Sequence, residues 1–369
     1  MRFPEFSEEW DSFKLVELGK FIGGGTPSSS NLSFWTGSIP WISSSDIKED
    51  NINNISISRY ITEDAIEKSA TKYCPAPVIL IVSRVGVGKV ALSHTSLCTS
   101  QDFCNIIDIK CHPVFLSYNL LRTMKRKSRE VQGTSIKGIT SDELQKIRVF
   151  IPKNKDEQNK ISNLLTLLDE RIATQNKIIE DLKKLKSAIR KKMFSLLKDE
   201  YTESFEINQL LDYEQPTAYI VANDEYSTDT SLTPVLTANK VFILGYTDEK
   251  FGIYQKGECI IFDDFTMDAK YVSFPFKVKS SAIKILTAKP NVNLRFMFEY
   301  LSYWELKSEE HKRHYISEIA SLVIELPSKE RQSIIASLMT SLNSKLDIEA
   351  KTKIRYEEQK RYLLSQMFI

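Results

Sequence analysis

Two long stretches of the chain repeat apolar side chains at alternating steps of three and four residues. They run from about Asp156 to Lys198 and from about Glu330 to Ile369. Nine of eleven seam positions are apolar in the first stretch: Ile161, Leu165, Leu168, Ile172, Gln175, Ile179, Leu182, Lys186, Ile189, Met193 and Leu196. Seven of ten are apolar in the second: Ile335, Met339, Leu342, Leu346, Glu349, Lys353, Tyr356, Lys360, Leu363 and Met367. This period of 3.5 residues is typical of a coiled-coil seam. It predicts two helices, each of about 40 residues and roughly 60 Å.

The two stretches are copies of each other. A shift of 174 residues aligns Gln158 with Gln332, Ile161 with Ile335, Leu164 with Leu338, Thr166 with Thr340, Leu168 with Leu342, and Met193-Phe194 with Met367-Phe368. Such a repeat indicates a duplicated half-protein, in which a globular region is followed by a long helix, twice. Two unrelated helical hairpins are the simpler alternative. Both seams become polar near their middle, which costs stability but can fix register and partner.

The segments before each long helix predict mixed α/β regions with many short strands. In the first region we expect a loop over Phe21–Ser30, helices over Asp64–Ser69 and Leu116–Lys127, and strands over Ser38–Ile42, Val78–Arg84, Lys89–Ser93, Phe103–Ile109 and Leu144–Ile151. The second region repeats this order with strands over Thr233–Thr237, Glu258–Phe262 and Leu322–Leu326 and a helix over Val292–Tyr303. The fold class is therefore α+β. The expected domains are residues 1–152, a helix over 153–200, residues 201–327, and a helix over 328–369.

Composition excludes several classes of protein. Charged residues make up 27% and hydrophobic residues 42% of the chain, as in ordinary globular proteins. Because no run of 18 apolar residues occurs, we expect no transmembrane helix and no membrane partner. The first ten residues carry three glutamates and no apolar stretch, unlike a signal peptide. The five cysteines are odd in number and form no CxxC pair, which favours reduced thiols and a cytoplasmic location.

The net charge of +2 does not indicate a nucleic-acid-binding protein, but two local clusters could bind phosphates. The first cluster is Arg122, Lys125, Arg126, Lys127 and Arg129. The second is Lys183, Lys184, Lys186, Arg190, Lys191 and Lys192. A solvated helix face explains either cluster equally well.

Catalytic motifs are missing. Gly86–Val90 resembles a phosphate-binding loop, yet Ser83 and Val90 stand where that motif needs glycine and Ser or Thr. The spacing of Asp102, Asp108 and Lys110 resembles a nuclease motif, but an outward-facing pair on a strand explains it as well. The spacing of Cys98, Cys104, Cys111 and His112 fits no structural zinc site. The chain carries neither a strand followed by GxGxxG nor the Asn-Pro-Pro-aromatic signature of amino-methyltransferases, so it is predicted to bind and not to catalyse.

This layout resembles the specificity subunit of type I restriction–modification enzymes. In the first half, the motifs that carry the resemblance are Gly25-Thr26-Pro27-Ser28, Ile39–Ser43, Ser83–Lys89, Gln132–Ser135 and Glu157-Gln158. In the second half they are Tyr213–Thr217, Thr233–Leu236, Phe262–Thr266 and His311–Ile316. Two departures are visible: Arg331-Gln332 replaces Glu-Gln at the head of the second helix, and the second region lacks the Gly-Thr-Pro loop.

The resemblance implies two target-recognition domains carried by an antiparallel, pseudo-twofold intramolecular coiled coil. It also implies double-stranded DNA, two modification (methyltransferase) subunits and restriction subunits as partners. Methyl transfer from S-adenosylmethionine would then occur on the modification subunit, with no cofactor on this chain. Two unlike domains on such a spacer would read a bipartite target.

Polar and basic side chains in the motif loops are the expected DNA contacts, because base edges need hydrogen-bonding groups and phosphates need cations. They are Thr26, Ser28, Ser44, Arg84, Lys89, Thr134, Ser135, Lys137, Asn239, Lys240, Thr266, Lys270, Arg313, His314 and Tyr315. Each could instead be an ordinary turn or capping residue. The competing function is a coiled-coil scaffold that binds proteins and has no specific affinity for DNA.

Overall fold

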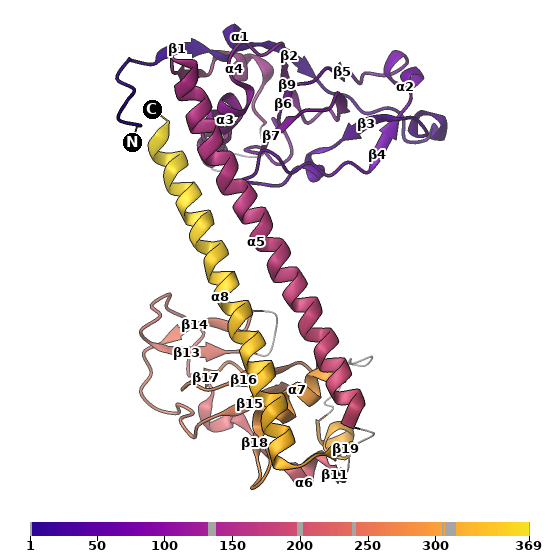
Figure 1. Ribbon diagram of the computed structural model, residues 1–369, viewed down its shortest axis with the longest axis vertical. Helices are drawn as coiled ribbons and strands as arrows, with labels where there is room; N and C mark the ends of the chain where they lie inside the picture. The colour runs from indigo at the N-terminus through magenta and orange to yellow at the C-terminus, as the bar shows by residue number, and fades with distance from the viewer. Residues whose placement is uncertain are drawn as a thin grey trace. The chain divides into compact units, whose positions relative to one another are not determined.

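The computed structural model describes residues 2–131, 138–197, 202–237, 241–304, 306 and 315–368. It divides into two compact units (Figure 1). The first unit contains Met1–Asn176 and Lys351–Ile369, and the second contains Lys177–Ala350. Each unit therefore holds one globular region together with about half of each long helix.

The first unit is built on two small sheets and one covering helix. Its elements are β1 Asp11–Lys14, α1 Leu15–Leu18, β2 Lys20–Gly23, η1 Leu32–Trp35, β3 Ile39–Ile42, η2 Ser44–Asp46, β4 Arg59–Ile61, α2 Glu63–Glu67, β5 Tyr73–Cys74, β6 Val78–Ile81, β7 Val90–Ser93, β8 Leu97–Thr99, β9 Cys104–Ile107, α3 Pro113–Val131, α4 Ser141–Lys146, β10 Arg148–Ile151 and the start of α5 Lys155–Leu196. The sheets have the orders β2-β9-β6-β7 and β4-β3-β8-β5, and β1 pairs with β10. Strand β6 is buried along its whole length, as its continuous apolar sequence predicts.

The second unit follows a similar plan. Its elements after α5 are β11 Glu203–Glu206, α6 Ile207–Leu210, β12 Leu211–Glu214, η4 Pro216–Tyr219, β13 Thr233–Leu236, β14 Ile243–Thr247, β15 Cys259–Asp263, β16 Ala269–Val272, β17 Lys277–Val278, β18 Ile283–Ala288, α7 Leu294–Tyr303, the π-helical turn η5 Tyr315–Ile319, β19 Val323–Leu326 and α8 Lys329–Met367. The sheets have the orders β12-β18-β15-β16 and β14-β13-β17, and β11 pairs with β19. The predicted α+β class is confirmed.

The two long helices pack against each other inside the first unit with opposite directions. Asp169 of α5 contacts Lys360 of α8, and Arg171 of α5 lies over the ring of Tyr356, four residues earlier in α8. The first unit's core also takes Leu165 of α5 together with Met367 and Phe368 at the end of the chain. In the second unit, Phe194 and Leu197 of α5 share one core with Ile335 and Ala336 of α8.

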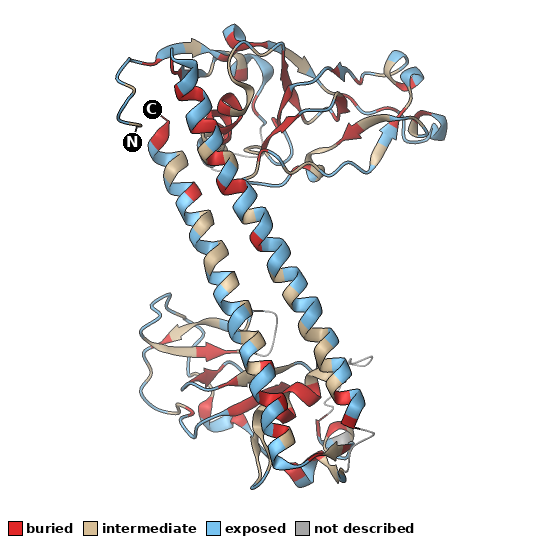
Figure 2. Cartoon of the chain, in the orientation of Figure 1, coloured by how far each residue is buried: buried red, intermediate tan, exposed pale blue. Residues whose placement is uncertain are grey.

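The predicted seams are confirmed by burial along both helices (Figure 2). Every seam position of α8 is buried or half-buried, including the polar Glu349 and Lys353. In α5 the agreement ends at Leu196, which is 42% exposed, while Phe194 and Leu197 are buried. The seam prediction is wrong at this last position, because α5 there meets the aromatic face of α7 and no longer only α8.

Matching contacts in the two units support the duplication. Gln158 Oε1 accepts from the backbone N–H of His112 (3.0 Å), and its Nε2 donates to the carbonyl of Pro152 (2.8 Å). Gln332 repeats this with Asn293 N–H (2.9 Å) and Pro327 O (3.0 Å). The two aligned glutamines therefore bind equivalent backbone N–H groups at the start of α3 and of α7.

Two predicted segments form a different type of element. Residues Phe21–Gly23, predicted as loop, form the end of β2, because they pair with Cys104–Ile106 far along the chain. Residues Leu144–Lys146, predicted as strand, belong to helix α4. Its start is fixed by a capping box, in which Thr140 Oγ1 accepts from Glu143 N–H (3.2 Å) and Glu143 accepts from Thr140 N–H (2.8 Å). Both predictions relied on local composition. The observed structure depends instead on strand pairing at Phe21–Gly23 and on helix capping at Leu144–Lys146.

Candidate nucleic-acid interface

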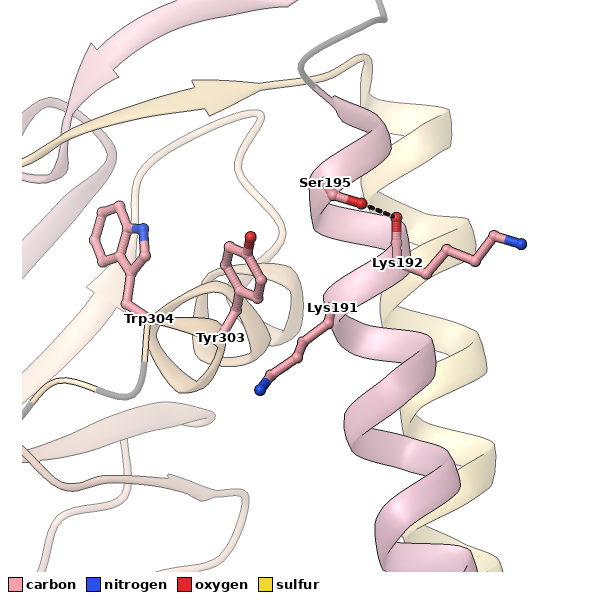
Figure 3. Close-up of a pocket in the computed structure, with 5 residues that line it drawn as sticks. All are labelled: Lys191, Lys192, Ser195, Tyr303 and Trp304. Carbon is pink, nitrogen blue, oxygen red and sulfur yellow. Dashed lines mark hydrogen bonds between the residues drawn. The ribbon is translucent and has the colours of Figure 1, made fainter.

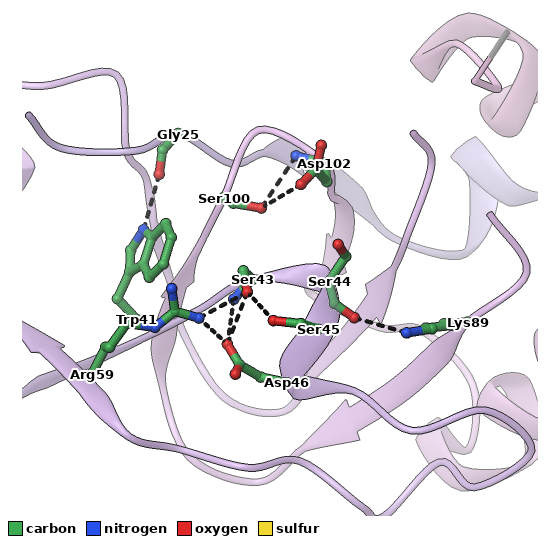
Figure 4. Close-up of polar contacts among 10 residues, drawn as sticks. All are labelled: Gly25, Trp41, Ser43, Ser44, Ser45, Asp46, Arg59, Lys89, Ser100 and Asp102. Atoms are coloured by element: carbon green, nitrogen blue, oxygen red, sulfur yellow. Dashed lines mark hydrogen bonds and ion pairs between the residues drawn. The ribbon is translucent and has the colours of Figure 1, made fainter. Parts of the chain in front are cut away.

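In the first unit, the end of β3 and the following turn carry a polar cluster (Figure 4). The indole of Trp41 is buried and donates to the carbonyl of Gly25 (3.0 Å), which anchors the Gly25–Ser28 loop beside β3. Arg59 of β4 lies over the Trp41 ring at 4.6 Å from its centroid. Its Nη2 donates to Ser43 Oγ (2.7 Å) and forms an ion pair with Asp46. A cation on an aromatic face with two polar partners holds this turn in one geometry.

The β6–β7 turn reaches the same place. Lys89 Nζ donates to the carbonyl of Ser44 (3.1 Å), and Val82 N–H donates to Lys89 O (3.0 Å). Arg84, at the start of this turn, is exposed. The predicted contacts Ser44, Arg84 and Lys89 therefore lie on neighbouring segments.

A third segment, Thr99–Asp102, joins this cluster to Thr26. Thr26 Oγ1 donates to Gln101 Oε1, and Gly25 N–H donates to Thr99 O (2.8 Å). One residue further on, the carbonyl of Asp102 accepts from Ser83 N–H (2.8 Å). Thr26, Ser44, Arg84 and Lys89 are thus linked by contacts between segments that are distant in sequence. Ser28 lies apart, in a local contact with Ser30 (2.8 Å).

The predicted contacts Thr134, Ser135 and Lys137 lie outside the described residues. The next described residues, Gly138 and Ile139, contact Ser83 beside this cluster. Ile139 N–H donates to the carbonyl of Ser83 (2.7 Å). At Gly138 an added Cβ would lie 2.5 Å from that same carbonyl, so only glycine permits this close approach. Gly138 and Ile139 therefore lie beside the β6–β7 turn.

In the second unit the β15–β16 turn takes the corresponding position. Asp263 Oδ1 accepts from the N–H groups of Phe265 and Thr266 (both 2.8 Å), which shapes the turn. Thr266 is exposed at the turn, and Lys270 follows in β16, where it is half-buried. These two predicted contacts share one hairpin.

A buried ion pair supports that hairpin. Asp264 and Lys284 are both about 1% exposed, and Asp264 Oδ2 lies 3.5 Å from Lys284 Nζ. Asp264 Oδ1 accepts from Tyr315 N–H (2.8 Å), so the pair also anchors the chain at η5. The Tyr315 ring packs against Phe262 and Tyr213, and burial raises the pKa of its hydroxyl. Tyr315 therefore lies in the core and is not exposed as a contact to DNA would require. Asn239, Lys240, Arg313 and His314 lie outside the described residues.

In each of the two basic clusters, some side chains form ion pairs with carboxylates of the protein. In the first, Lys125 pairs with Asp50 (2.7 Å). In the second, Lys186 and Arg190 turn toward buried Glu299 of α7 (3.8 and 2.6 Å), so they face protein and not a phosphate. Lys191 points instead toward Tyr303, in a depression of about 650 Å³ that Lys192, Ser195 and Trp304 also line (Figure 3). Within the figure Lys192 extends away from it, and Ser195 Oγ donates to the Lys192 carbonyl (2.9 Å).

Neither a metal cluster nor a membrane span occurs in the part of the chain that the structure describes. No group of three or more His, Cys, Asp or Glu residues there could hold a metal ion. No described helix is both long and apolar enough to cross a bilayer. All five cysteines are free, and burial raises the pKa of Cys98 to about 12, which makes it an unreactive thiol. Asp108 follows β9 with φ of 52° and does not lie in the alternating strand expected for it.

Sequence reasoning missed Trp41, Arg59, Asp46 and the Asp264–Lys284 pair as parts of the site. Trp41 belongs to the Ile39–Ser43 motif. Its partner Arg59 is 18 residues further along the chain, on strand β4, which lies next to β3 only in the folded protein. Asp264 lay in a motif as well, but the sequence around Lys284 gave no sign of its role. Non-local partners of this kind leave no spacing that a single sequence can reveal.

A sequence profile for the type I restriction modification DNA specificity domain matches residues 7–184 and again residues 200–358. The chain therefore belongs to this family, and the resemblance inferred from its motifs is confirmed. The assignment places it among the specificity components of these systems and not among their catalytic ones.

Among curated relatives, the specificity subunit of the type I restriction enzyme EcoR124I/EcoR124II from Escherichia coli is 39% identical over 178 residues, which are 43% of each chain. The MjaIX specificity subunit of Methanocaldococcus jannaschii is 32% identical over 223 residues, 58% of this chain and 50% of the relative. The matches thus span about half the length of these two relatives. The putative MjaX specificity subunit of the same organism is 23% identical over 98% of this chain and 93% of its own length.

Solved structures agree on the fold. The crystal structure of a type I restriction–modification S subunit from M. genitalium superposes with a TM-score of 0.65 at 17% identity, covering 100% of this chain and 99% of that one. A chain from a structure on complex assembly and conformational transition of the type I system gives a TM-score of 0.60 at 13% identity, covering 98% of each. At such identities the likeness establishes the fold alone.

Proposed function

We propose that this chain is the DNA-reading subunit of a type I restriction–modification complex and reads a bipartite target. The observation that carries the proposal is the double family match, since each match covers one globular region and most of the long helix that follows it. The two recognition domains would be residues 1–152 and 201–327, with residues 153–200 and 328–369 as the spacer helices.

The chemistry of the two candidate surfaces supports a difference between the half-sites. The first surface offers Thr26, Ser44 and exposed Arg84, together with the tryptophan–arginine stack of Trp41 and Arg59. The second offers Thr266 and Lys270 on a hairpin braced by a buried ion pair. Arginine suits guanine in the major groove, and hydroxyl groups suit either base edges or phosphates. Surfaces so unlike are expected to read different bases.

The partners follow from the family and remain part of the proposal. Two modification subunits would bind beside α5 and α8, with restriction subunits beyond them, and S-adenosylmethionine would be used on the modification subunits. Five free thiols fit a reducing compartment, the cytoplasm. The scaffold alternative predicts the same helices but no discrimination between DNA sequences.

The test exchanges one domain. The chain is produced with its modification subunits, and methylated sites are sequenced in cells that carry either the natural chain or one whose residues 205–325 come from a related subunit. We expect a bipartite methylated motif whose two half-sites respond independently: the exchange changes the sequence of one half-site and leaves the sequence of the other unchanged. A swap that altered both halves would contradict the division of labour, and a complex that methylates no defined motif would favour the scaffold.

A further inference from the structure

Three buried groups meet in the first unit where α3 faces both long helices. Lys360 of α8 pairs with Asp169 of α5, and the hydroxyl of Tyr118 of α3 donates to the same carboxylate (2.7 Å). The side chains of Lys360 and Asp169 are 5% and 4% exposed, and Tyr118 is fully buried. Burial and the adjacent Asp169 carboxylate both raise the pKa of Tyr118, so it stays a neutral donor. A buried ammonium is stable only with partners of this kind.

The same lysine reaches the loop that leads to the candidate interface. Lys360 Nζ donates to the backbone carbonyl of Asp50 (2.6 Å), in the loop between η2 and β4. Asp50 has φ of 59°, and its carboxylate binds Lys125 of α3. The loop returns through Ser56, whose N–H donates to Asp46 O (2.8 Å). Since Asp46 holds Arg59, a side chain of α8 fixes the segment that carries the tryptophan–arginine cluster.

The second unit contains a matching group with exchanged roles. The shift of 174 residues places Lys186 on Lys360 and Asn343 on Asp169. The glutamine contacts at the starts of α3 and α7 align His112 with Asn293, which places Glu299 on Tyr118. Phe115 and Phe296 occupy aligned positions too, and they pack on the aligned Phe368 and Phe194.

In this second group the carboxylate comes from the domain's own helix. Buried Glu299 lies 3.8 Å from Lys186 Nζ and 2.6 Å from Arg190 Nη2, and its Oε1 accepts from Asn343 Nδ2 (3.4 Å). The lysine thus keeps its place in both units, while the acid moves from the long helix to the domain helix. The amide of Asn343 takes over the donor role of the Tyr118 hydroxyl.

Mixed combinations would leave a buried charge without compensation. A domain with Glu at the Tyr118 position on a helix with Asp169 would bring two carboxylates to one lysine. A domain with Tyr at the Glu299 position on a helix with Asn343 would leave Lys186 without its counter-ion. Like charges in such a site repel, and an unpaired buried ion is strongly unfavourable.

We propose that Lys360 and Lys186 are positioning residues for the two recognition domains, and that the residues facing each lysine are matched, Tyr with Asp or Glu with Asn. A domain exchanged between subunits is then held correctly only if it arrives with its matching partner on the long helix. The matching concerns the fold, whereas the effect on DNA reading rests on the proposed function.

The matching is tested by thermal unfolding of the full chain carrying Tyr118→Glu, Asp169→Asn or both. We expect each single change to lower Tm by about 10 °C. The double variant should recover at least half of the Tyr118→Glu loss, because it brings Glu, Asn and Lys together as around Glu299, although Leu364 stands at the position aligned with Arg190. The control pairs Tyr118→Glu with Asp181→Asn, on an exposed position of α5, and should recover nothing. A double variant no more stable than the worse single one overturns the matching.

Positioning is tested with Lys360→Met and Lys186→Met, each in the complex with modification subunits, by binding to duplexes altered in one half-site. Lys360→Met should lose about tenfold in discrimination, or about 1.4 kcal/mol, at the first domain's half-site and keep the second, and Lys186→Met should do the reverse. Lys360→Arg should retain most of the discrimination. Equal loss at both half-sites, or no loss, overturns the positioning role. If the natural chain shows no discrimination, the proposed function fails instead, and the unfolding measurements still decide the matching.

Discussion

Gln158 and Gln332 each satisfy two backbone groups that would otherwise be buried beside the head of a long helix. In each glutamine, the amide oxygen accepts a hydrogen bond from the backbone N–H at the start of the domain helix. The amide nitrogen donates to the carbonyl of the proline that precedes the long helix. Both side chains are buried. A single residue type at one repeated position therefore ties strand end, domain helix and long helix together in both units.

Replacing either glutamine by alanine should leave a buried N–H and a buried carbonyl without partners. We expect Gln158→Ala and Gln332→Ala each to cost about 1–3 kcal/mol of unfolding free energy, measured in urea. The exposed Gln359→Ala on α8 serves as the control and should change it little. If the three variants unfold alike, the glutamine contacts do not contribute as their geometry suggests.

Residues of the interface divide into those that the sequence could reveal and those that it could not. Arg84, Lys89 and Ser44 could be proposed as contacts because turns with glycine, serine and basic side chains are visible as local patterns, and the structure places them on neighbouring segments. Arg59 of the candidate interface and the buried Lys360 that supports it could not, because their partners Trp41 and Asp169 come from other strands and helices. The misassigned Tyr315 shows the converse: a polar aromatic beside basic residues can still be core.

The long helices show what periodicity can predict at the level of an element. Alternating steps of three and four fixed both helices to within one or two residues of their observed ends. Short strands were placed less well, since β2 exists through pairing with β9 and α4 through its capping box. Periodicity also failed at Leu196, where a second element replaced the coiled-coil partner.

The seam provides a direct test with neighbouring residues. Leu168 is buried, while Leu167 beside it is 47% exposed. Leu168→Glu should cost several kcal/mol because it buries an unpaired charge, and Leu167→Glu should cost little. Leu342→Glu, at the half-buried aligned position of α8, should fall between them. Thermal unfolding and binding of modification subunits are the measurements, and equal effects at Leu167 and Leu168 would exclude the assigned seam.

At the level of the whole molecule, α5 and α8 pass without interruption through the boundary between the two units. Their polar middle positions, Gln175 on α5 and Glu349 with Lys353 on α8, lie near that boundary. If the helices set the distance between half-sites, their length should determine the number of unread base pairs.

Lengthening α5 tests this role. Four residues inserted after Asn176 add about 6 Å and nearly one turn, so the seam stays almost in phase. At about 3.4 Å per base pair, the methylated motif should gain one or two unread base pairs and keep both half-site sequences. Inserting two residues rotates the seam by roughly half a turn and should lower Tm. Full methylation with an unchanged spacer would show that the helices are not the ruler.

The first unit is assembled from segments that lie far apart in the chain, and this sets an order for its folding during synthesis. Residues 351–368 complete a core that contains Trp10, Phe115 and Leu165, but the whole second unit must be translated before they emerge. At roughly 5–20 residues per second, the nascent first unit waits on the order of ten seconds or more with that apolar face uncovered. The second unit is continuous in sequence and can close as it leaves the ribosome. The domain made first is therefore finished last, and its apolar face is the one that stays exposed longer during synthesis.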